Sequence, residues 1–271
     1  MMQRVPLNGV ELEYEVRGSG DPLIFIHGAI LADAFFPLLT EPKIADHFRV
    51  INYHRRGFAG SDRAPTPFLI HQQAADCSAL LRHLNIPRAH VAGHSYGAIT
   101  ALQMALDAPE LIQSLALLEP VVLDAIPSGP SFGEGVSAIQ EIYERGDKSG
   151  ATDAFLTAVV GDNYRQVIDK VLPAGAFELA VADLDTFFQV EMPALQQWRF
   201  TAEDAKRITQ PVVSVVGNET APIFSETHDL LKQWLPQTEE LRIPQATHGL
   251  QAMNPGAIAE GLSRFFAKHS L

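Results

Sequence analysis

Short apolar runs alternate with stretches of helical spacing along most of this chain, and this alternation restricts the folds open to it. The predicted strands are Leu23–Ile26, Phe48–Tyr53, Ala89–Ala92, Ser114–Leu118, Val212–Val216 and Glu240–Ile243. Strands that are short and apolar on both faces are typical of a buried parallel sheet. The predicted helices are Leu69–Leu84, Tyr96–Leu106, Glu226–Leu235 and Pro255–Lys268. Together these elements predict an α/β fold with a doubly wound, mostly parallel sheet.

The N-terminal segment is predicted to form a β-hairpin. Val5–Leu7 and Val10–Val16 flank Asn8-Gly9, a dipeptide suited to the positive φ angles of a tight turn. Gly18-Ser19-Gly20 resembles a dinucleotide-binding loop but precedes a strand instead of following one, so we interpret it as a turn. Since the sequence also lacks zinc-ligand spacing and a P-loop, we expect no cofactor.

The alternation stops between Ala125 and Lys206. Ile126–Gly133 is rich in helix breakers and is predicted to be a linker. Helical patterns follow at Val136–Glu144, Asp153–Val160, Tyr164–Leu172 and Ala176–Val190. An all-helical insertion between two strands is expected to lie over the strand ends as a cap. We therefore predict a core domain formed by residues 1–124 and 207–271 and a helical cap insertion at residues 125–206.

Composition limits the partners and the compartment. A chain of 271 residues can bury one large core, and its formal charge of −12 disfavours nucleic acid and anionic lipid. Cys77 is the only cysteine, which excludes an intrachain disulfide. No apolar run resembles a signal peptide or reaches the ~18 residues of a membrane span. We expect a soluble, cytoplasmic protein that acts on a small molecule, and the sequence does not indicate its oligomeric state.

A candidate nucleophile lies in Gly93–Gly97, which reads Gly-His-Ser-Tyr-Gly. A strand-like segment precedes this motif and a helix-like segment follows it, which is the setting of a nucleophile elbow. The sharp turn strains the serine backbone, and side chains two residues to either side would collide with it. Ser95 is therefore predicted to present its hydroxyl at a strand end, whereas the adjacent His94 is interpreted as a packed, hydrogen-bonded residue that points away from it.

An ester carbonyl attacked by Ser95 needs two hydrogen-bond donors for its oxyanion. One candidate is the backbone amide of Tyr96, the residue after the nucleophile. The other is the amide of Ala29, in the loop after the strand Leu23–Ile26, where Gly28 permits close approach. Both roles belong to backbone groups, so the side chains carry little information about them.

These motifs make the sequence similar to the α/β-hydrolase family, in the branch with a helical cap after the sixth strand. The matching pieces are His27-Gly28, Arg56–Ser61, Gly93–Ala98, Pro211–Gly217 and Ala246–Gly249. The resemblance implies Ser95 as nucleophile, His248 as base, and the amides of Ala29 and Tyr96 as oxyanion hole. His248 also follows a predicted strand, on the same sheet edge as Ser95. Four other histidines lie in helical or connecting segments and are interpreted as surface or packing residues: His47, His71, His83 and His228.

The triad acid is less clearly marked. In the family this acid often follows the strand after the cap, but Thr220 stands at that position here. Glu119 ends the strand Ser114–Leu118, where some family members carry a glutamate, and Pro120 is expected to hold it in an extended backbone. We favour Glu119. Glu219, another acid or a weakened dyad without an acid remain alternatives, and in each case Glu119 would be a solvated charge at the strand end.

The predicted reaction is acyl transfer from a small or medium apolar ester or lactone to Ser95, followed by hydrolysis. Aromatic residues of the insertion are candidates for an apolar pocket, although such residues more often form a core: Phe155, Phe177, Phe187, Phe188, Trp198 and Phe200. Hydrolysis of a carbon–carbon bond uses the same residues and is an alternative. A receptor or signalling protein that keeps the triad but turns over slowly is another.

Overall fold

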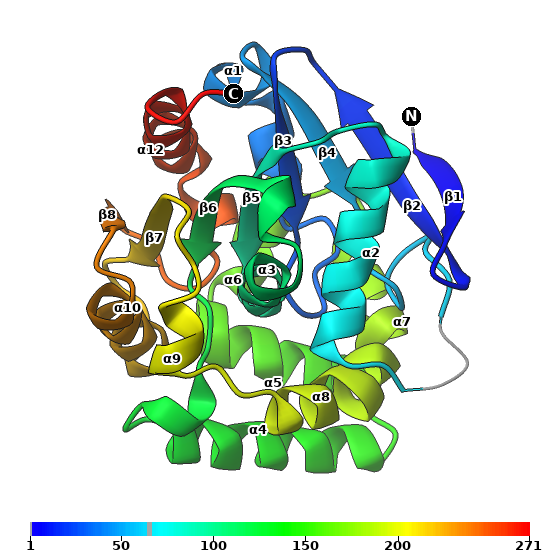
Figure 1. Cartoon of the computed structure of the whole chain (residues 1–271). Helices are drawn as coiled ribbons and strands as arrows, with labels where there is room; N and C mark the ends of the chain where they lie inside the picture. Colours follow the sequence, from blue (N-terminus) through cyan, green and yellow to red (C-terminus); the bar gives the residue numbers. More distant parts are fainter. Residues whose placement is uncertain (1, 64–66) are drawn as a thin grey trace.

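The computed structural model describes residues 2–63 and 67–271 and contains an eight-stranded sheet (Figure 1). The strands are β1 (Gln3–Leu7), β2 (Val10–Arg17), β3 (Asp21–Ile26), β4 (Phe48–Tyr53), β5 (Ala89–His94), β6 (Ile112–Leu118), β7 (Val212–Gly217) and β8 (Thr238–Ile243). Their order across the sheet is β1-β2-β4-β3-β5-β6-β7-β8. Only the pairs β1/β2 and β2/β4 are antiparallel among these strands. The predicted hairpin and the mostly parallel sheet are confirmed.

Helices cover both faces of the sheet. One face packs against α2 (Ile70–His83), α3 (Tyr96–Asp107) and α10 (Pro222–Trp234), and the other against α1 (Pro42–Ala45), α11 (Leu250–Met253) and α12 (Pro255–Ala267). Successive side chains of a strand point to opposite faces. In β3, Ile24 and Ile26 accordingly enter one core cluster, and Leu23 and Phe25 enter the other. The alternation of strand and helix in the sequence thus reflects a sheet buried on both sides.

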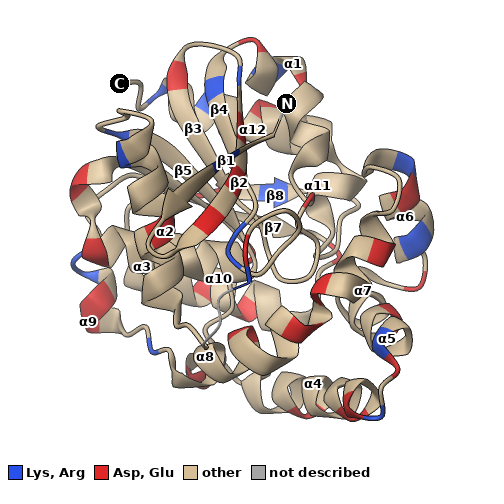
Figure 2. Cartoon of the chain, turned by 90° about the vertical axis from the view of Figure 1, so that its right-hand side faces the viewer, with Lys and Arg blue, Asp and Glu red and all other residues tan. Residues whose placement is uncertain are grey.

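Charged residues lie mainly on the outer elements. The central strands β5, β6 and β7 contain no Asp, Glu, Lys or Arg. Outer helices do, and Figure 2 shows this for α5 (Lys148–Val160), α6 (Tyr164–Val171) and α9 (Ala202–Ala205). Cys77 is a free, buried thiol in α2. Within the described residues, no helix is both long and apolar enough to cross a bilayer.

A helical segment separates β6 from β7 in the chain. Its elements are α4 (Gly129–Glu144), α5 (Lys148–Val160), α6 (Tyr164–Val171), α7 (Ala176–Thr186), a π-helix (Phe187–Glu191), α8 (Met192–Gln197) and α9 (Ala202–Ala205). We call residues 129–197 the cap segment. Figure 1 shows α4, α5 and α8 grouped on one side of the sheet. This segment has its own core cluster, which also receives Tyr96 and Phe224 from the sheet-covering helices. The described residues also contain short 3₁₀ helices: Phe36–Thr40, Pro109–Leu111 and Leu123–Ala125.

Two predictions about this segment are wrong in detail. The supposed linker Ile126–Gly133 is partly helical, because α4 already begins at Gly129. Pro130 lies in the first turn, where a missing N–H costs nothing. The predicted single helix Ala176–Val190 changes to a π-helix at Phe187. The π-helix follows Thr186 and ends at Glu191. Both residues form hydrogen bonds to the loop after β4, Thr186 to the Gly57 carbonyl and Glu191 to Arg55.

The early start of α4 can be tested at Gly133. A methyl group there meets no atom within 4 Å, and the residue lies inside a helix. Gly133→Ala should therefore raise the free energy of unfolding by about 0.5–1 kcal/mol. Denaturant unfolding followed by circular dichroism measures this change. In Gly97→Ala, by contrast, the new methyl group would overlap the carbonyl oxygen of Ile26, so that variant should be destabilised. A less stable Gly133→Ala protein would contradict the helical assignment.

Candidate active site

Ser95 lies at a strained turn between β5 and α3. Its backbone has φ 53° and ψ −120°, a combination that non-glycine residues rarely adopt. A Cβ atom on Gly93 would overlap the backbone oxygen of Gly97, and one on Gly97 would overlap that of Ile26. The Ser95 amide donates to the carbonyl of Leu118 at 2.8 Å, which ties the turn to β6. Both glycines are therefore required by close backbone approach, and the serine has the geometry of a nucleophile elbow.

Glu119 and His248 meet at the same edge of the sheet. Nδ1 of His248 lies 2.6 Å from Oε2 of Glu119, and Oε1 of Glu119 accepts a 2.8 Å bond from the Gly217 amide. Both side chains are buried. Glu119 directly follows β6, as Ser95 follows β5, and these strands are paired up to His94 and Leu118. The parallel register thus brings nucleophile and carboxylate to neighbouring strand ends.

The backbone of Glu119 differs from the extended form expected before Pro120. Its φ is 46°, in the left-handed region. The Glu119 amide still donates to the Val215 carbonyl at 3.1 Å, so the chain is held to β7 where it leaves the sheet. The turn at this point is imposed by the pairing and outweighs the local preference of a residue before proline.

The contact with Glu119 fixes the proton of the neutral His248 imidazole. An ionised carboxylate only accepts hydrogen bonds, so Nδ1 carries the proton and Nε2 keeps a lone pair. The ring is stacked on Phe224, with centroids 3.7 Å apart and planes 7° from parallel. The ring of His94 is 4.6 Å away, and its Nε2 donates to the His248 carbonyl at 3.0 Å. The imidazole is therefore held in one orientation.

Burial is the largest influence on the pKa of both partners. It lowers the pKa of His248 to about 3 and raises that of Glu119 to about 7, against the opposing effect of the Gly217 amide. Thr220 lies near enough to lower the Glu119 pKa as well. The two groups share one short hydrogen bond and exchange protons as a pair. The burial of His248 lowers the pKa of its imidazole far enough to keep the ring neutral at pH 7.

The two candidate oxyanion donors lie beside Ser95. Ala29 lines the same cavities as Ser95, and Tyr96 is the first residue of α3, where backbone amides lack a partner within the helix. Among the described residues, neither amide donates a hydrogen bond. The helix dipole of α3 adds a favourable field for negative charge at this point. Both amides are thus available to a ligand oxygen.

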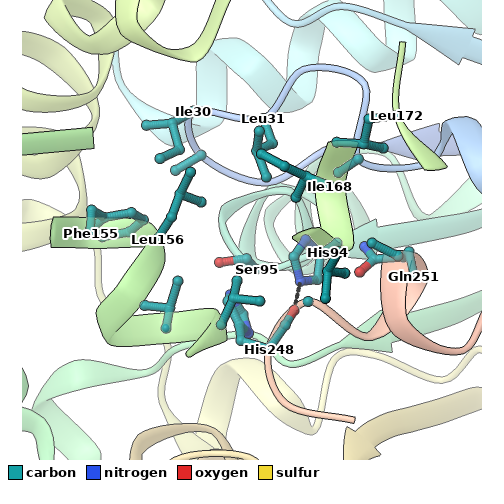
Figure 3. A pocket seen from close by; sticks show the side chains of 17 residues that line it. Ile30, Leu31, His94, Ser95, Phe155, Leu156, Ile168, Leu172, His248 and Gln251 are labelled. Atoms are coloured by element: carbon teal, nitrogen blue, oxygen red, sulfur yellow. Dashed lines mark hydrogen bonds between the residues drawn. The ribbon is translucent and has the colours of Figure 1, made fainter. Parts of the chain in front are cut away.

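Two cavities meet at Ser95 and His248. Their volumes include the open solvent at the mouth. The first, of about 580 Å³, is shown in Figure 3, where the labelled side chains surround Ser95. It is lined mainly by Ile30, Leu31, Leu156, Ile168 and Leu172. The second, of about 450 Å³, is lined mainly by Ile99, Val121, Phe132, Met192 and Phe224. No Asp, Glu, Lys or Arg is found among the described residues of either lining.

The aromatic residues of the insertion divide into two groups. Phe155 and Phe187 line the cavities at Ser95. The others pack elsewhere: Phe177 under Arg165, Phe188 on Tyr143, and Trp198 on Phe200. Most of the candidates from the sequence are therefore core residues, and two contact the site.

The remaining sequence candidates lie outside this arrangement or take another place in it. Glu219 is exposed, and only its backbone is bonded, to the Ala246 carbonyl. His94 does not point away from the site but lies beside His248 and lines the first cavity. His228 is buried against Ser214 and Glu240, a packing role. Phe224 was not expected, because its position at the start of a helix carries no signal of contact with His248. The described residues contain no cluster of metal-ligating side chains.

Known proteins share this architecture. Among them, 2-(acetamidomethylene)succinate hydrolase of Mesorhizobium japonicum is 23% identical, covering 97% of this chain and 94% of that protein. The enol-lactonase of Burkholderia xenovorans superposes with a TM-score of 0.83 at 20% identity, covering 98% of this chain and all of that one. A thermophilic esterase of Thermogutta terrifontis superposes with a TM-score of 0.80 at 21% identity over the full length of both chains. At this level of identity, such superpositions establish the fold.

The family itself follows from a match along most of the chain. Residues 21–255 match the model of the alpha/beta hydrolase fold, a range that contains the strained serine, the carboxylate after β6 and the histidine after β8. The sequence of elements and the geometry of the sheet agree with that match. This chain therefore belongs to the α/β-hydrolase fold family and is a hydrolase.

Proposed function

We propose that this protein hydrolyses small or medium, uncharged apolar carboxylic esters or lactones through an acyl-enzyme on Ser95. The observation that carries the proposal is the His248–Glu119 pair, whose imidazole shares an uncharged, apolar double cavity with Ser95. A nucleophile, an oriented base and two free amides are the parts that acyl transfer requires.

The first half of the reaction acylates Ser95. The Ser95 hydroxyl gives its proton to Nε2 of His248 as its oxygen bonds to the substrate carbonyl carbon. The carbonyl oxygen becomes an oxyanion, which accepts hydrogen bonds from the amides of Ala29 and Tyr96. Glu119 stabilises the imidazolium that forms. The carbon–oxygen bond to the leaving alcohol then breaks, and the alcohol takes the proton from Nε2.

The second half releases the acid. Water gives a proton to Nε2 and its oxygen attacks the acyl carbon, forming a second oxyanion at the same two amides. The bond to Ser95 breaks, and the proton returns from Nε2 to the serine oxygen. In a lactone the alcohol and acid stay on one molecule, so the product is a hydroxy acid.

Serine-dependent turnover separates this proposal from its alternatives. Wild type should hydrolyse 4-nitrophenyl hexanoate and a medium-chain lactone, and Ser95→Ala should lose this activity by at least about 10⁴-fold. Mass spectrometry of a rapidly quenched reaction should show an acyl group on wild type only. Turnover of a vinylogous diketone but of no ester would favour carbon–carbon hydrolysis. Tight binding of esters or lactones without turnover would favour a receptor.

Replacement of the acid tests the role of Glu119. In Glu119→Gln an amide faces Nδ1, so the imidazole loses the acceptor that fixes its tautomer. We expect kcat to fall by about 10⁴-fold, the loss seen when the triad acid of a serine protease is amidated. Glu219→Gln, at an exposed site, is the matched control and should keep normal turnover. Thermal unfolding should show that both variants remain folded. Normal turnover by folded Glu119→Gln would remove this residue from the mechanism.

Because the described cavity walls carry no charged groups, we expect the protein to prefer an uncharged ester to a matched anionic ester. The mono-4-nitrophenyl ester of adipic acid carries a carboxylate where 4-nitrophenyl hexanoate carries a methyl group. Burial of an unpaired charge is costly, so kcat/KM for the anionic ester should be lower by about 100-fold or more. Initial rates at low substrate concentration give both constants. Equal values of kcat/KM would contradict this prediction. They would show that the carboxylate stays in solvent or pairs with a cation outside the described cavity walls.

A further inference from the structure

Arg55, in the loop after β4, is the largest side chain that is fully buried in the described residues. Its guanidinium donates from Nε to the carbonyl of His27 at 2.9 Å and from Nη2 to the carbonyl of Gly28 at 2.7 Å. Nη1 bonds to Glu191 of the cap segment and to Gln73 of α2. One cation thus joins the loop that carries Ala29 to the cap segment.

The bond to Gly28 determines where the Ala29 amide points. The carbonyl of Gly28 and the N–H of Ala29 belong to one planar trans peptide, so they point in opposite directions. Holding the carbonyl on Arg55 therefore directs the N–H away from Arg55, toward the side on which Ala29 lines the cavities with Ser95.

His27 adds a second hydrogen bond to the same carbonyl. Its Nε2 accepts from the Arg55 backbone amide at 2.9 Å, so in the neutral ring Nδ1 carries the proton and donates to the Gly28 carbonyl at 2.8 Å. Burial lowers the pKa of His27 well below its usual value, which keeps this ring neutral. A carbonyl that accepts two hydrogen bonds polarises its peptide and strengthens the N–H as a donor.

The same cation also contacts the other oxyanion residue. The Arg55 guanidinium carbon lies 5.0 Å from the centre of the Tyr96 ring, within the range of a cation–π contact. Glu191 is wholly buried, and within the described residues its ion pair is with Arg55. Among the described residues, no other charged side chain forms an ion pair with either group, so the cap segment contributes the charge that balances Arg55.

We propose that Arg55 is a positioning residue for the oxyanion hole and that Glu191 of the cap segment holds it in place. The inference rests on the proposed function, because it assumes that the Ala29 amide binds the oxyanion. It adds that the cap segment, besides lining the cavities, fixes the orientation of a catalytic amide through the pair Glu191–Arg55. Displacement of the cap segment would then weaken transition-state binding as well as open the site.

The test compares ethyl hexanoate with its thionoester, in which sulfur replaces the carbonyl oxygen. Sulfur is larger and accepts hydrogen bonds poorly. The ratio of kcat/KM for the oxygen ester to kcat/KM for the thionoester, the oxygen-to-sulfur ratio, therefore reports on the oxyanion donors. The double variant Arg55→Met/Glu191→Met removes the cation without leaving a buried charge. We expect its kcat on the oxygen ester to fall by about 10²–10³-fold with little change in KM, and the ratio to fall by at least about tenfold.

A matched control lies one residue away. Arg56 forms a buried ion pair with Asp76 and has no bond to His27 or Gly28. Arg56→Met/Asp76→Asn should cost stability but leave the oxygen-to-sulfur ratio unchanged. Arg63→Met removes another contact to the cap segment, with Asp183, and should also keep the ratio.

The outcomes distinguish the inference from the proposed function. If wild type hydrolyses neither these esters nor the medium-chain lactone, the proposed function fails. If wild type is active and the Arg55 variant loses activity on both substrates equally, Arg55 is only structural and the inference is wrong. Should the double variant not fold, Arg55→Lys keeps the charge that Glu191 needs but loses the planar fork that bonds both carbonyls. A folded Arg55→Lys protein with the wild-type ratio would likewise overturn the inference.

Discussion

The site depends on a backbone conformation that serine rarely adopts. Ser95 is held at positive φ by the pairing of its amide with β6 and by the close approach of Gly93 and Gly97 to neighbouring backbone. Such strain costs about 1–3 kcal/mol, and the packed sheet must supply it. The strand order and the two glycines are therefore conditions for the hydroxyl to reach the sheet edge. The positions of Glu119 and His248 follow from the same parallel register.

The sequence predicted the parts whose signal is local. The strands and most helices have clear periodicity, and the nucleophile motif carries its steric reason in the flanking glycines. Glu119 was favoured over Glu219 because it ends a predicted strand, and the structure brings it to 2.6 Å from His248. Phe224 and Arg55 were missed, since their contacts arise from packing between elements far apart in sequence. The left-handed backbone of Glu119 was missed because strand pairing outweighs the preference set by Pro120.

The cap segment contributes both to the cavity walls and to the contacts that hold the loop after β4. Its apolar side chains line both cavities, and its π-helix places Glu191 on Arg55 while Thr186 bonds to Gly57. Glu191 and Thr186 are buried where they bond to this loop, which favours one arrangement of the segment over the sheet. Under the proposal that Arg55 positions the Ala29 amide, substrate selection and the geometry of the reacting groups are coupled through the loop after β4.

The stacking of Phe224 on His248 has a consequence for the order of events in acyl transfer. The rings of Phe224 and His94 both lie against the imidazole, so in the proposed cycle Nε2 stays directed to one place. The departing alcohol and the incoming water must therefore occupy that place in succession. The alcohol product has to leave before water can enter. An alcohol that stays at this place competes with water for the acyl group.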